Sequence, residues 1–267
     1  MCDTSAVEAS DLIEVDLGPR ARGFFTTRGL RARPVSAPGG GAQDRDAESE
    51  EGTSYDGWNL ALHVGDDPQR VHCHRRLLGL EQGSHLAWMN QIHSAVVATA
   101  QAGEVPTADA LVLDSRTGGA PAGCCVLVAD CVPVLLASRD GALTAAVHAG
   151  RRGMLDGVVP ATVDSLRRGG VDPADLWAAV GPSICGSCYE VPEEMLALSA
   201  QREPACASRT SWGTPGLDVA AGVLAQLERA GVGHISAGQW CTYEDPRFFS
   251  YRRDGVTGRL AGIGVPQ

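Results

Sequence analysis

The chain has 267 residues, 44% of them hydrophobic, which is enough to bury a substantial core without disulfide bonds. Its formal net charge of −10 and its pI near 5.1 argue against a general nucleic-acid-binding protein. The longest apolar runs are too short to span a bilayer, and the acidic N-terminal residues lack the pattern of a signal peptide. We therefore predict a cytoplasmic protein whose nine cysteines are free or metal-bound.

The first half of the chain predicts a flexible insertion followed by a helix and several short strands. Residues 31–53 are rich in proline, glycine and acidic side chains and have almost nothing to bury, which is typical of a mobile surface insertion. Apolar residues at helical spacing, including Val71, Leu77 and Leu78, predict a helix over 68–80. Nearly continuous apolar runs then predict buried strands. These strands cover residues 95–99, 110–113, 126–129, 132–137 and 143–148.

The second half predicts mostly helices and ends in a strand pair. Residues 154–170 form an amphipathic pattern, in which Pro160 is expected to kink the helix or to mark its true start. A buried strand is expected at 176–181, and helices are expected at 191–200 and 217–232. Residues 247–264 are interpreted as two strands joined by an Asp-Gly turn. This mixture predicts one α/β or α+β domain over residues 1–267.

Three residues are the best candidates for chemistry. His93, Cys131 and His148 each lie where a strand-like apolar run meets a small polar break. Histidine and cysteine are ligands for a borderline-soft metal such as zinc. Three such ligands, with nothing obvious supplying a fourth, indicate an open catalytic zinc site better than a closed structural one.

Six ordered motifs also support a resemblance to a known family. NQIHSAVV, ADALVLD, ADCVPVLLA, AAVHAGRRG, GPSICGSCYEV and FFSYRRDGVTGR resemble the laccase-domain family, also called the polyphenol oxidase or purine nucleoside phosphorylase family. FFTTR and WNLALHVGDD match it as well, so the likeness runs from about Phe24 to Gly264 apart from the insertion. The resemblance implies a four-layer α/β/β/α arrangement of mixed sheets. It also implies that His93, Cys131 and His148 are the catalytic residues that hold Zn²⁺, with copper as the alternative metal.

The same resemblance implies a reaction. Family members cleave the N-glycosidic bond of purine nucleosides with phosphate and also deaminate adenosine. Adenosine, inosine and S-methyl-5'-thioadenosine are therefore the expected substrates, with phosphate as the second one. No nucleic acid or membrane partner is expected, and the protein is expected to be a monomer or a small homo-oligomer.

Five further residues are candidates for substrate binding. Arg152 lies at the expected start of a helix, where an anion is favoured, and Arg28 and Arg253 could complete a phosphate clamp. Arg152→Ala is therefore expected to weaken phosphate use more than deamination. Asn59 could meet a purine edge or a ribose hydroxyl, or could serve a turn. Asp130 could orient a histidine, carry a proton, or have a purely structural role.

The chain departs from the family pattern at three places. Arg151 stands where the family usually has tryptophan, and Ser94 replaces the usual glycine after the histidine. Cys185 and Cys188 are separated by two residues, whereas the family commonly has its two cysteines side by side in the sequence. A C-x-x-C sequence can be half of a zinc site or a redox pair, but no second C-x-x-C completes a four-cysteine site, which favours a packing role.

Three other functions remain open from the sequence, one of which is a metal-storage or interaction protein that binds zinc without catalysis. Copper-dependent phenol oxidation is the activity behind the family's older name, and the His-Cys-His sequence at 72–74 superficially resembles copper ligands. That sequence is interpreted as an exposed helix segment, since four coppers need many histidines and the chain has seven. A cysteine hydrolase would use Cys131 as nucleophile and His148 or His93 as base.

Overall fold

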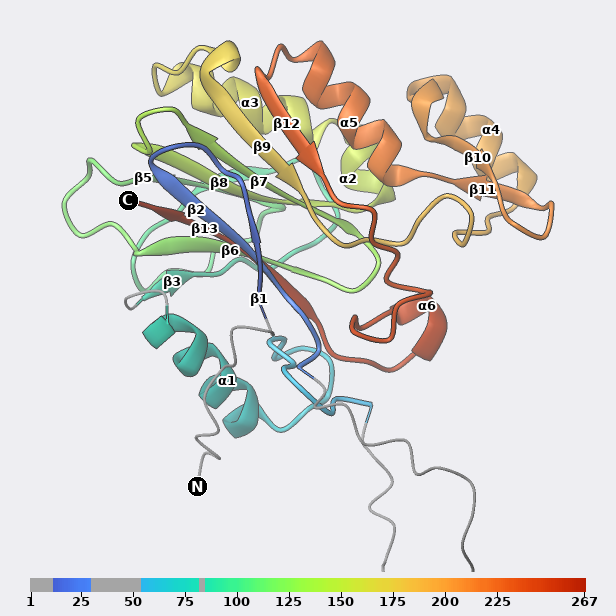
Figure 1. Ribbon diagram of the computed structural model, residues 1–267, viewed down its shortest axis with the longest axis horizontal. Coiled ribbons are helices and arrows are strands. Elements are labelled where there is room, and N and C mark those ends of the chain that lie inside the picture. Colours follow the sequence, from blue (N-terminus) through green and yellow to red (C-terminus); the bar gives the residue numbers. More distant parts are fainter. Residues whose placement is uncertain (1–11, 30–53, 82–84) are drawn as a thin grey trace, which may run out of the picture.

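The computed structural model describes residues 12–29, 54–81 and 85–267, and the expected insertion at 31–53 lies outside them. Strands dominate the described chain up to residue 149, and most helices follow (Figure 1). The strands are β1 (Leu12–Val15), β2 (Ala21–Thr26), β3 (Leu86–Ala87), β4 (Val97–Thr99), β5 (Ala110–Asp114), β6 (Gly123–Val128), β7 (Val132–Ser138), β8 (Leu143–Ala149), β9 (Leu176–Val180), β10 (Ala207–Arg209), β11 (Pro215–Leu217), β12 (His234–Ala237) and β13 (Leu260–Pro266). The α-helices are α1 (Pro68–Glu81), α2 (Arg151–Asp156), α3 (Val158–Arg168), α4 (Glu193–Arg202), α5 (Val219–Arg229) and α6 (Tyr251–Asp254).

The strands form two mixed sheets and a small hairpin. One sheet has five strands in the order β1-β2-β13-β6-β3, and the other has six in the order β12-β9-β7-β8-β5-β4. The hairpin is β10-β11. In the six-stranded sheet β7 and β8 are central, and every residue of both is buried. Burial on both faces explains the continuous apolar run in β7, VPVLLA, whereas β8 also carries the buried polar residues Thr144 and His148.

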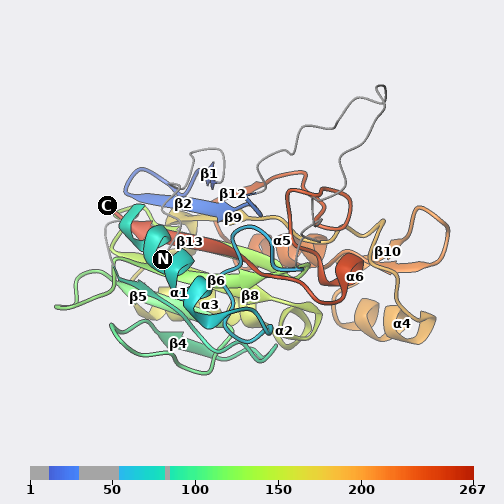
Figure 2. The ribbon, with the colours of Figure 1, turned by 90° about the horizontal axis from the view of Figure 1, so that it is seen from below.

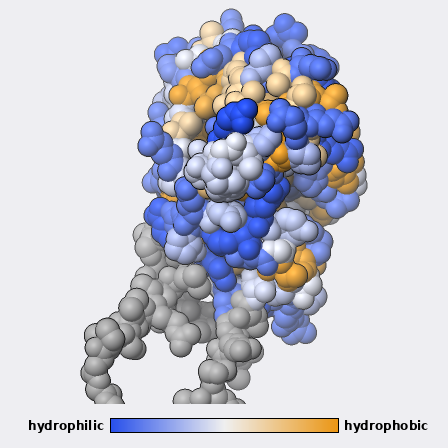
Figure 3. Space-filling model, turned by 90° about the vertical axis from the view of Figure 1, so that its right-hand side faces the viewer, coloured by the Kyte–Doolittle hydropathy of each residue, from blue (hydrophilic) through white to orange (hydrophobic). Residues whose placement is uncertain are grey.

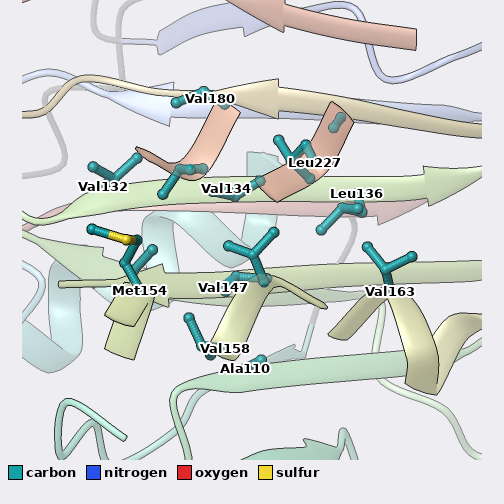
Figure 4. Packing of buried hydrophobic residues seen from close by; sticks show 14 of the residues in the cluster. Ala110, Val132, Val134, Leu136, Val147, Met154, Val158, Val163, Val180 and Leu227 are labelled. Carbon is teal, nitrogen blue, oxygen red and sulfur yellow. The ribbon is translucent and has the colours of Figure 1, made fainter. Parts of the chain in front are cut away.

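Three apolar clusters separate four layers. The first lies between the two sheets and includes Phe25, Leu111 and Leu135. The second lies between the six-stranded sheet and α2, α3 and α5, where strand residues such as Val134 face helix residues such as Met154 (Figure 4). The third packs α1 against the outer face of the five-stranded sheet. The layers therefore follow the expected α/β/β/α order, with α1 on one side and the other large helices opposite (Figures 1 and 2).

The central strand predictions are confirmed. The strands expected at 110–113, 132–137 and 143–148 are β5, β7 and β8. β6 begins earlier than expected, at Gly123, so that it includes Cys124 and Cys125, which are fully buried. The edge strands β1 and β12 were not predicted, because each has four mostly unburied residues. β2, which lies between β1 and β13, was also not predicted, although five of its six residues are buried.

The helix expected over 154–170 is two helices. Gly157 separates α2 from α3 with a left-handed backbone, φ 90°, which a residue with a side chain adopts only at a cost. Pro160 lies in the first turn of α3, where its missing N–H group has no intrahelical partner to lose, so it causes no kink. Pro160 therefore lies near the true start of the second helix, one of the two expected outcomes.

The strand pair expected at 247–264 is wrong in its first half. Ser250 instead caps a short helix, α6, and its Oγ accepts a hydrogen bond from the backbone N–H of Arg253 at 3.2 Å. Only β13 is a strand. The aromatic letters of FFSY suggested a strand, but the N-cap serine and tertiary contacts decided the local conformation.

The His-Cys-His segment lies on α1 and is only partly exposed. His72 is exposed, as expected. Cys73 is buried at 6% exposure, and the His74 ring stacks on Trp58 at 5.4 Å, so the expectation of a wholly exposed segment is wrong. Alternate helical positions point to opposite faces, and one face of α1 covers a sheet.

One face of the molecule is mostly polar. The face that carries α4 and the β10-β11 hairpin is largely hydrophilic with small scattered apolar areas (Figure 3). Leu198 on α4 and Trp212 beside the hairpin are exposed large hydrophobic residues of this part of the chain. Among the described residues, every helix is too short or too polar to cross a lipid bilayer.

Candidate metal centre and active-site cavity

The fold brings His93, Cys131 and His148 together. Nε2 of His93 lies 3.7 Å from Sγ of Cys131, and the two imidazole rings have centroids 4.7 Å apart. One potential ligand atom from each residue lies within 4.8 Å of the others. The β7–β8 register explains part of this, since it pairs Pro133 with His148 and thus places Cys131, just before β7, beside the end of β8.

One buried carboxylate organises both histidines. Asp109 accepts a hydrogen bond from Nδ1 of His148 at 2.8 Å. It also accepts hydrogen bonds from the backbone N–H groups of Ile92, His93 and Ser94, with N···O distances of 2.6–3.3 Å. Ser94, one of the departures from the family pattern, adds a hydroxyl hydrogen bond to the same carboxylate at 2.7 Å. Asp109 therefore fixes the ring of one candidate ligand and the backbone of the other.

Two residues at the site have unusual backbone angles. Among the described residues other than glycine, only His93, φ 60°, and Asp130, φ 93°, have positive φ. Such conformations cost free energy and persist where surrounding contacts enforce them. The Asp130 carboxylate accepts hydrogen bonds from the hydroxyls of Thr242 and Ser250, each at 2.7 Å, and from the backbone N–H of Arg252 at 2.6 Å. These contacts hold the turn that presents Cys131.

Gly150 gives the ligands room. A Cβ atom at this position would lie 2.8 Å from Cδ2 of His93 and 3.0 Å from Sγ of Cys131. Both separations are shorter than van der Waals contact, so a side chain here would displace the two groups. The His-Ala-Gly motif therefore ends in glycine because the side chains of His93 and Cys131 lie too close for a Cβ atom.

The local electrostatics favour a thiolate beside protonated or metal-bound imidazole. Burial alone raises the pKa of Cys131, but the neighbouring His148 and His93 outweigh it and lower this pKa to about 6. Burial lowers the pKa of His148, but Cys131 and Asp109 raise it to about 9. Burial raises the pKa of Asp109, yet the hydrogen bonds from His148 and Ser94 hold it well below its usual range.

These groups fit a divalent metal. Thiolate sulfur and imidazole nitrogen are the donors that zinc prefers, and three protein ligands leave a position for substrate or water. The contact of His148 Nδ1 with Asp109 leaves Nε2 of that ring to face the other two donors. Metal-binding histidines characteristically donate their other ring N–H to a carboxylate in this way.

The candidate ligands line a cavity of about 360 Å³. Arg259 is the single arginine in its wall among the described residues, and burial lowers its pKa. His63 also faces the cavity, and burial together with Arg259 and Arg75 lowers its pKa, which favours a neutral imidazole. The lining residues are His63, Gln91, His93, Leu127, Val128, Ala129, Cys131, His148, Tyr251 and Arg259.

The other arginines singled out from the sequence lie outside this lining. Nε of Arg28 donates to the backbone carbonyl of Asp56 at 3.0 Å, and its guanidinium lies over the Phe249 ring. Arg253 donates to backbone carbonyls including those of Thr242 and Phe248, each at 2.8 Å. Arg152 is exposed on α2. Arg28 and Arg253 therefore hold loops together around the site.

Asn59 is fully buried and engaged with protein groups. Its Nδ2 donates to Asp66 Oδ2 at 2.8 Å, and its Oδ1 accepts the backbone N–H groups of Ala61 and Arg259, each at 3.0 Å. These contacts correspond to the turn role considered for it. By binding the backbone of Arg259, Asn59 positions the arginine that faces the cavity.

Sequence reasoning missed several residues of the site, among them Asp109, His63, Gln91 and Arg259. Each lies within a motif already recognised, namely ADALVLD, WNLALHVGDD, NQIHSAVV and FFSYRRDGVTGR. An acidic residue directly before an apolar strand, as Asp109 is, was the available signal. Nothing in the sequence alone indicates that Gln91 pairs with the backbone of Leu127 through hydrogen bonds of 2.7 and 2.8 Å.

Comparisons with known proteins identify the family of this chain. A family model described as multi-copper polyphenol oxidoreductase laccase matches residues 44–265. A protein of Streptomyces coelicolor named purine nucleoside phosphorylase SCO2081 is 51% identical over 215 residues, covering 78% of this chain and 87% of that protein. Purine nucleoside phosphorylase ORF3 of Streptomyces griseus is 47% identical, covering 78% and 86%.

Solved structures show the same fold. Neisseria meningitidis protein NMB0706 superposes with a TM-score of 0.79 at 32% identity, covering 96% of this chain and 99% of that one. YlmD from Geobacillus stearothermophilus also gives a TM-score of 0.79, at 27% identity and 98% coverage of both chains.

The fold and the site together define a four-layer α/β/β/α protein with an open Cys-His-His constellation in a cavity. The chain belongs to the laccase-domain family described as multi-copper polyphenol oxidoreductase laccase.

Proposed function

We propose that this protein is a metal-dependent purine nucleoside phosphorylase that also deaminates adenosine. The observation that carries the proposal is the open set of His93, Cys131 and His148 in a cavity that also contains Arg259. The 51% identity to a protein named purine nucleoside phosphorylase supports the reaction class. Adenosine, inosine and S-methyl-5'-thioadenosine are the proposed nucleosides.

His93, Cys131 and His148 are the residues that would hold the metal, and zinc suits this donor set better than copper. When bound, the ion supplies Lewis-acid activation of a water molecule or of a substrate oxygen. Asp109 keeps His148 in the tautomer that directs Nε2 inward and holds the backbone of His93. Asp130 positions Cys131 through its contacts with Thr242 and Ser250.

Arg259 is the proposed phosphate-binding residue. Its backbone is fixed by Asn59, and its NH1 group donates to the carbonyls of Thr257 and Gly258 at 2.8 and 3.0 Å. A guanidinium held in the wall of a small cavity binds an anion more strongly than an exposed one, because water screens it less. His63, beside it in the wall, can hydrogen-bond the substrate. Arg28, Arg253 and the exposed Arg152 then act outside direct substrate contact.

The direct test is an assay of purified, metal-analysed protein with each nucleoside, with and without phosphate. Products are separated by liquid chromatography, which distinguishes free base from deaminated nucleoside. We expect base release only with phosphate, deamination of adenosine without it, and loss of both after removal of the metal by a chelator. His148→Ala should abolish both activities, whereas the exposed His72→Ala serves as the matched histidine control. Equal base release by wild type and His148→Ala would refute the proposal.

A cysteine hydrolase is the second candidate, because the lowered pKa of Cys131 beside two histidines also suits a nucleophile. The two functions differ in their metal requirement. Activity that survives complete metal removal and is abolished by thiol alkylation would favour the hydrolase. Phenol oxidation is less well supported, since only three of the seven histidines, His63, His93 and His148, line the cavity.

A further inference from the structure

A second group of metal-binding side chains lies outside the cavity just described. Cys185 and Cys188 form the C-x-x-C sequence, and the fold adds Cys241 and Glu244 from a part of the chain more than fifty residues away. One potential ligand atom from each of the four residues lies within 4.8 Å of the others. The three cysteines are free thiols, and Cys188 is buried at 4% exposure.

The backbone explains why these residues meet. β9 and β12 are parallel neighbours, so the segments that leave their ends continue side by side (Figure 1). Ser183 pairs with Cys241 in an isolated parallel bridge, and Thr242 N donates to the Ser183 carbonyl at 3.0 Å. The C-x-x-C turn closes on itself, since the N–H groups of Cys188 and Tyr189 both donate to the Cys185 carbonyl at 3.0 Å.

The geometry suits a tetrahedral ion. With Zn–S bonds near 2.3 Å, tetrahedral coordination places sulfurs about 3.8 Å apart, so atoms within 4.8 Å need only small side-chain movements. The backbone N–H of Cys185 points at Sγ of Cys241, with N and S 3.5 Å apart. An N–H group aimed at sulfur stabilises a thiolate. A divalent cation that displaces the thiol protons would hold the three sulfurs together as thiolates.

We propose that Cys185, Cys188, Cys241 and Glu244 bind a second divalent metal of the zinc class. Four protein ligands close the coordination sphere, so this site is structural, in contrast to the three-ligand centre in the cavity. Binding releases the thiol protons to solvent and requires no oxidant. The sequence pattern showed only half of the site, because Cys241 and Glu244 carry no second C-x-x-C signature.

The site would brace the loop that supports the first centre. Cys241 directly precedes Thr242, whose hydroxyl donates to Asp130 at 2.7 Å. On the other side, Ile184 N donates to the Asp130 carbonyl at 3.0 Å, and Ile184 directly precedes Cys185. Both segments of the proposed site therefore contact Asp130, which presents Cys131. Loss of the second metal should lower the thermal stability of the protein, and its effect on the chemistry in the cavity should be smaller.

Metal stoichiometry of the full chain, reconstituted with Zn²⁺ under reducing conditions and freed of loose metal, tests this proposal. We expect two zinc ions per chain in the wild type, one in His148→Ala, one in Cys241→Ser, and none in the double variant. Glu244→Gln, an exposed and conservative change, should weaken zinc retention at the second site without affecting folding. Glu228→Gln, on the exposed side of α5, is its matched control and should retain both ions.

Cobalt substitution identifies the site spectroscopically. In His148→Ala, bound Co²⁺ should show thiolate charge-transfer absorption about three times that of the ion remaining in Cys241→Ser, because three sulfurs coordinate instead of one. A wild type with one zinc, lost completely in His148→Ala, would overturn the proposal even if the cysteine variants fail to fold. A disulfide among the three thiols after reducing purification, seen as missing titratable thiols, would overturn it equally.

Discussion

The carboxylate of Asp109 accepts the Nδ1 hydrogen bond of His148 at 2.8 Å. The same buried group also accepts the backbone N–H of His93 at 2.9 Å. One acid thus orients two imidazoles that lie 55 positions apart in the sequence. Asp109 is fully buried and directly precedes β5, which pairs with the central strand β8.

Replacing this acid should weaken metal binding. Asp109→Asn removes the negative charge and places an amide donor against backbone N–H donors, so both histidines lose their orientation. We expect zinc affinity to fall about 10–100-fold, measured by competition with a chromophoric chelator. Asp114→Asn, at the other end of the same strand and paired with Arg116, should leave affinity unchanged. Unaltered zinc affinity in Asp109→Asn would mean that the backbone alone sets the ligand geometry.

A single methyl group at position 150 should disrupt the centre. Gly150→Ala places Cβ 2.8 Å from His93 Cδ2 and 3.0 Å from Cys131 Sγ, which forces the two ligands apart. Misplacement of catalytic groups by about 1 Å costs about 100-fold in rate, and we expect a loss of that order in nucleoside cleavage. Gly118→Ala is the matched control, since a Cβ there meets nothing within 4 Å. Comparable activity in both variants would exclude the proposed ligand arrangement.

Arg259 and Arg152 can be distinguished by phosphate dependence. Arg259→Ala removes the arginine from the cavity wall, and we expect the KM for phosphate to rise at least about tenfold while phosphate-independent deamination changes less. Arg152→Ala, a change on the exposed surface of α2, should have a much smaller effect. Initial rates of base release at varied phosphate concentration give the KM for phosphate of both variants. The reverse ranking would restore Arg152 as the anion ligand expected from the sequence.

An ion pair between a buried carboxylate and an exposed arginine, away from the site, should contribute to stability. Glu203 is 1% exposed and is paired with Arg229, whose NH1 lies 3.3 Å from Oε1. Arg229→Met leaves a buried carboxylate without its partner, and we expect a loss of about 1–3 kcal/mol in the free energy of unfolding by urea titration. Arg167→Met, which breaks an exposed pair with Asp164, should cost less than about 1 kcal/mol.

The same pair predicts a pH dependence. Burial raises the pKa of Glu203, but Arg229 outweighs burial and lowers it below its ordinary value. A carboxyl group with a lowered folded-state pKa stabilises the protein above its unfolded-state pKa, and this stabilisation is lost as pH falls through the folded-state value. The difference in the free energy of unfolding between wild type and Arg229→Met should therefore be largest at neutral pH and decrease in acid. A difference that stays constant down to acid unfolding would show that the effect is not electrostatic.

Apolar patterning in the sequence determined the architecture well. The continuous run around Leu135 indicated a strand buried on both faces, and the spacing of apolar residues at 68–80 indicated a helix. Patterning was misleading around Ser250, where a hydroxyl cap and a distant carboxylate, rather than side-chain periodicity, determine the backbone. Residue type and ordered motifs likewise singled out His93, Cys131 and His148 before any geometry was known.

Only the tertiary structure decided which groups meet. Asp109 and Arg259 acquire their roles from strand pairing and loop closure, which join residues far apart in the chain and leave no local periodic signal. The C-x-x-C sequence pointed to packing until the parallel pairing of β9 with β12 placed Cys241 beside it. The ability of a side chain to bind a metal depends on its residue type, so the sequence reveals it. Whether several such side chains meet at one site depends on long-range contacts that only the fold establishes.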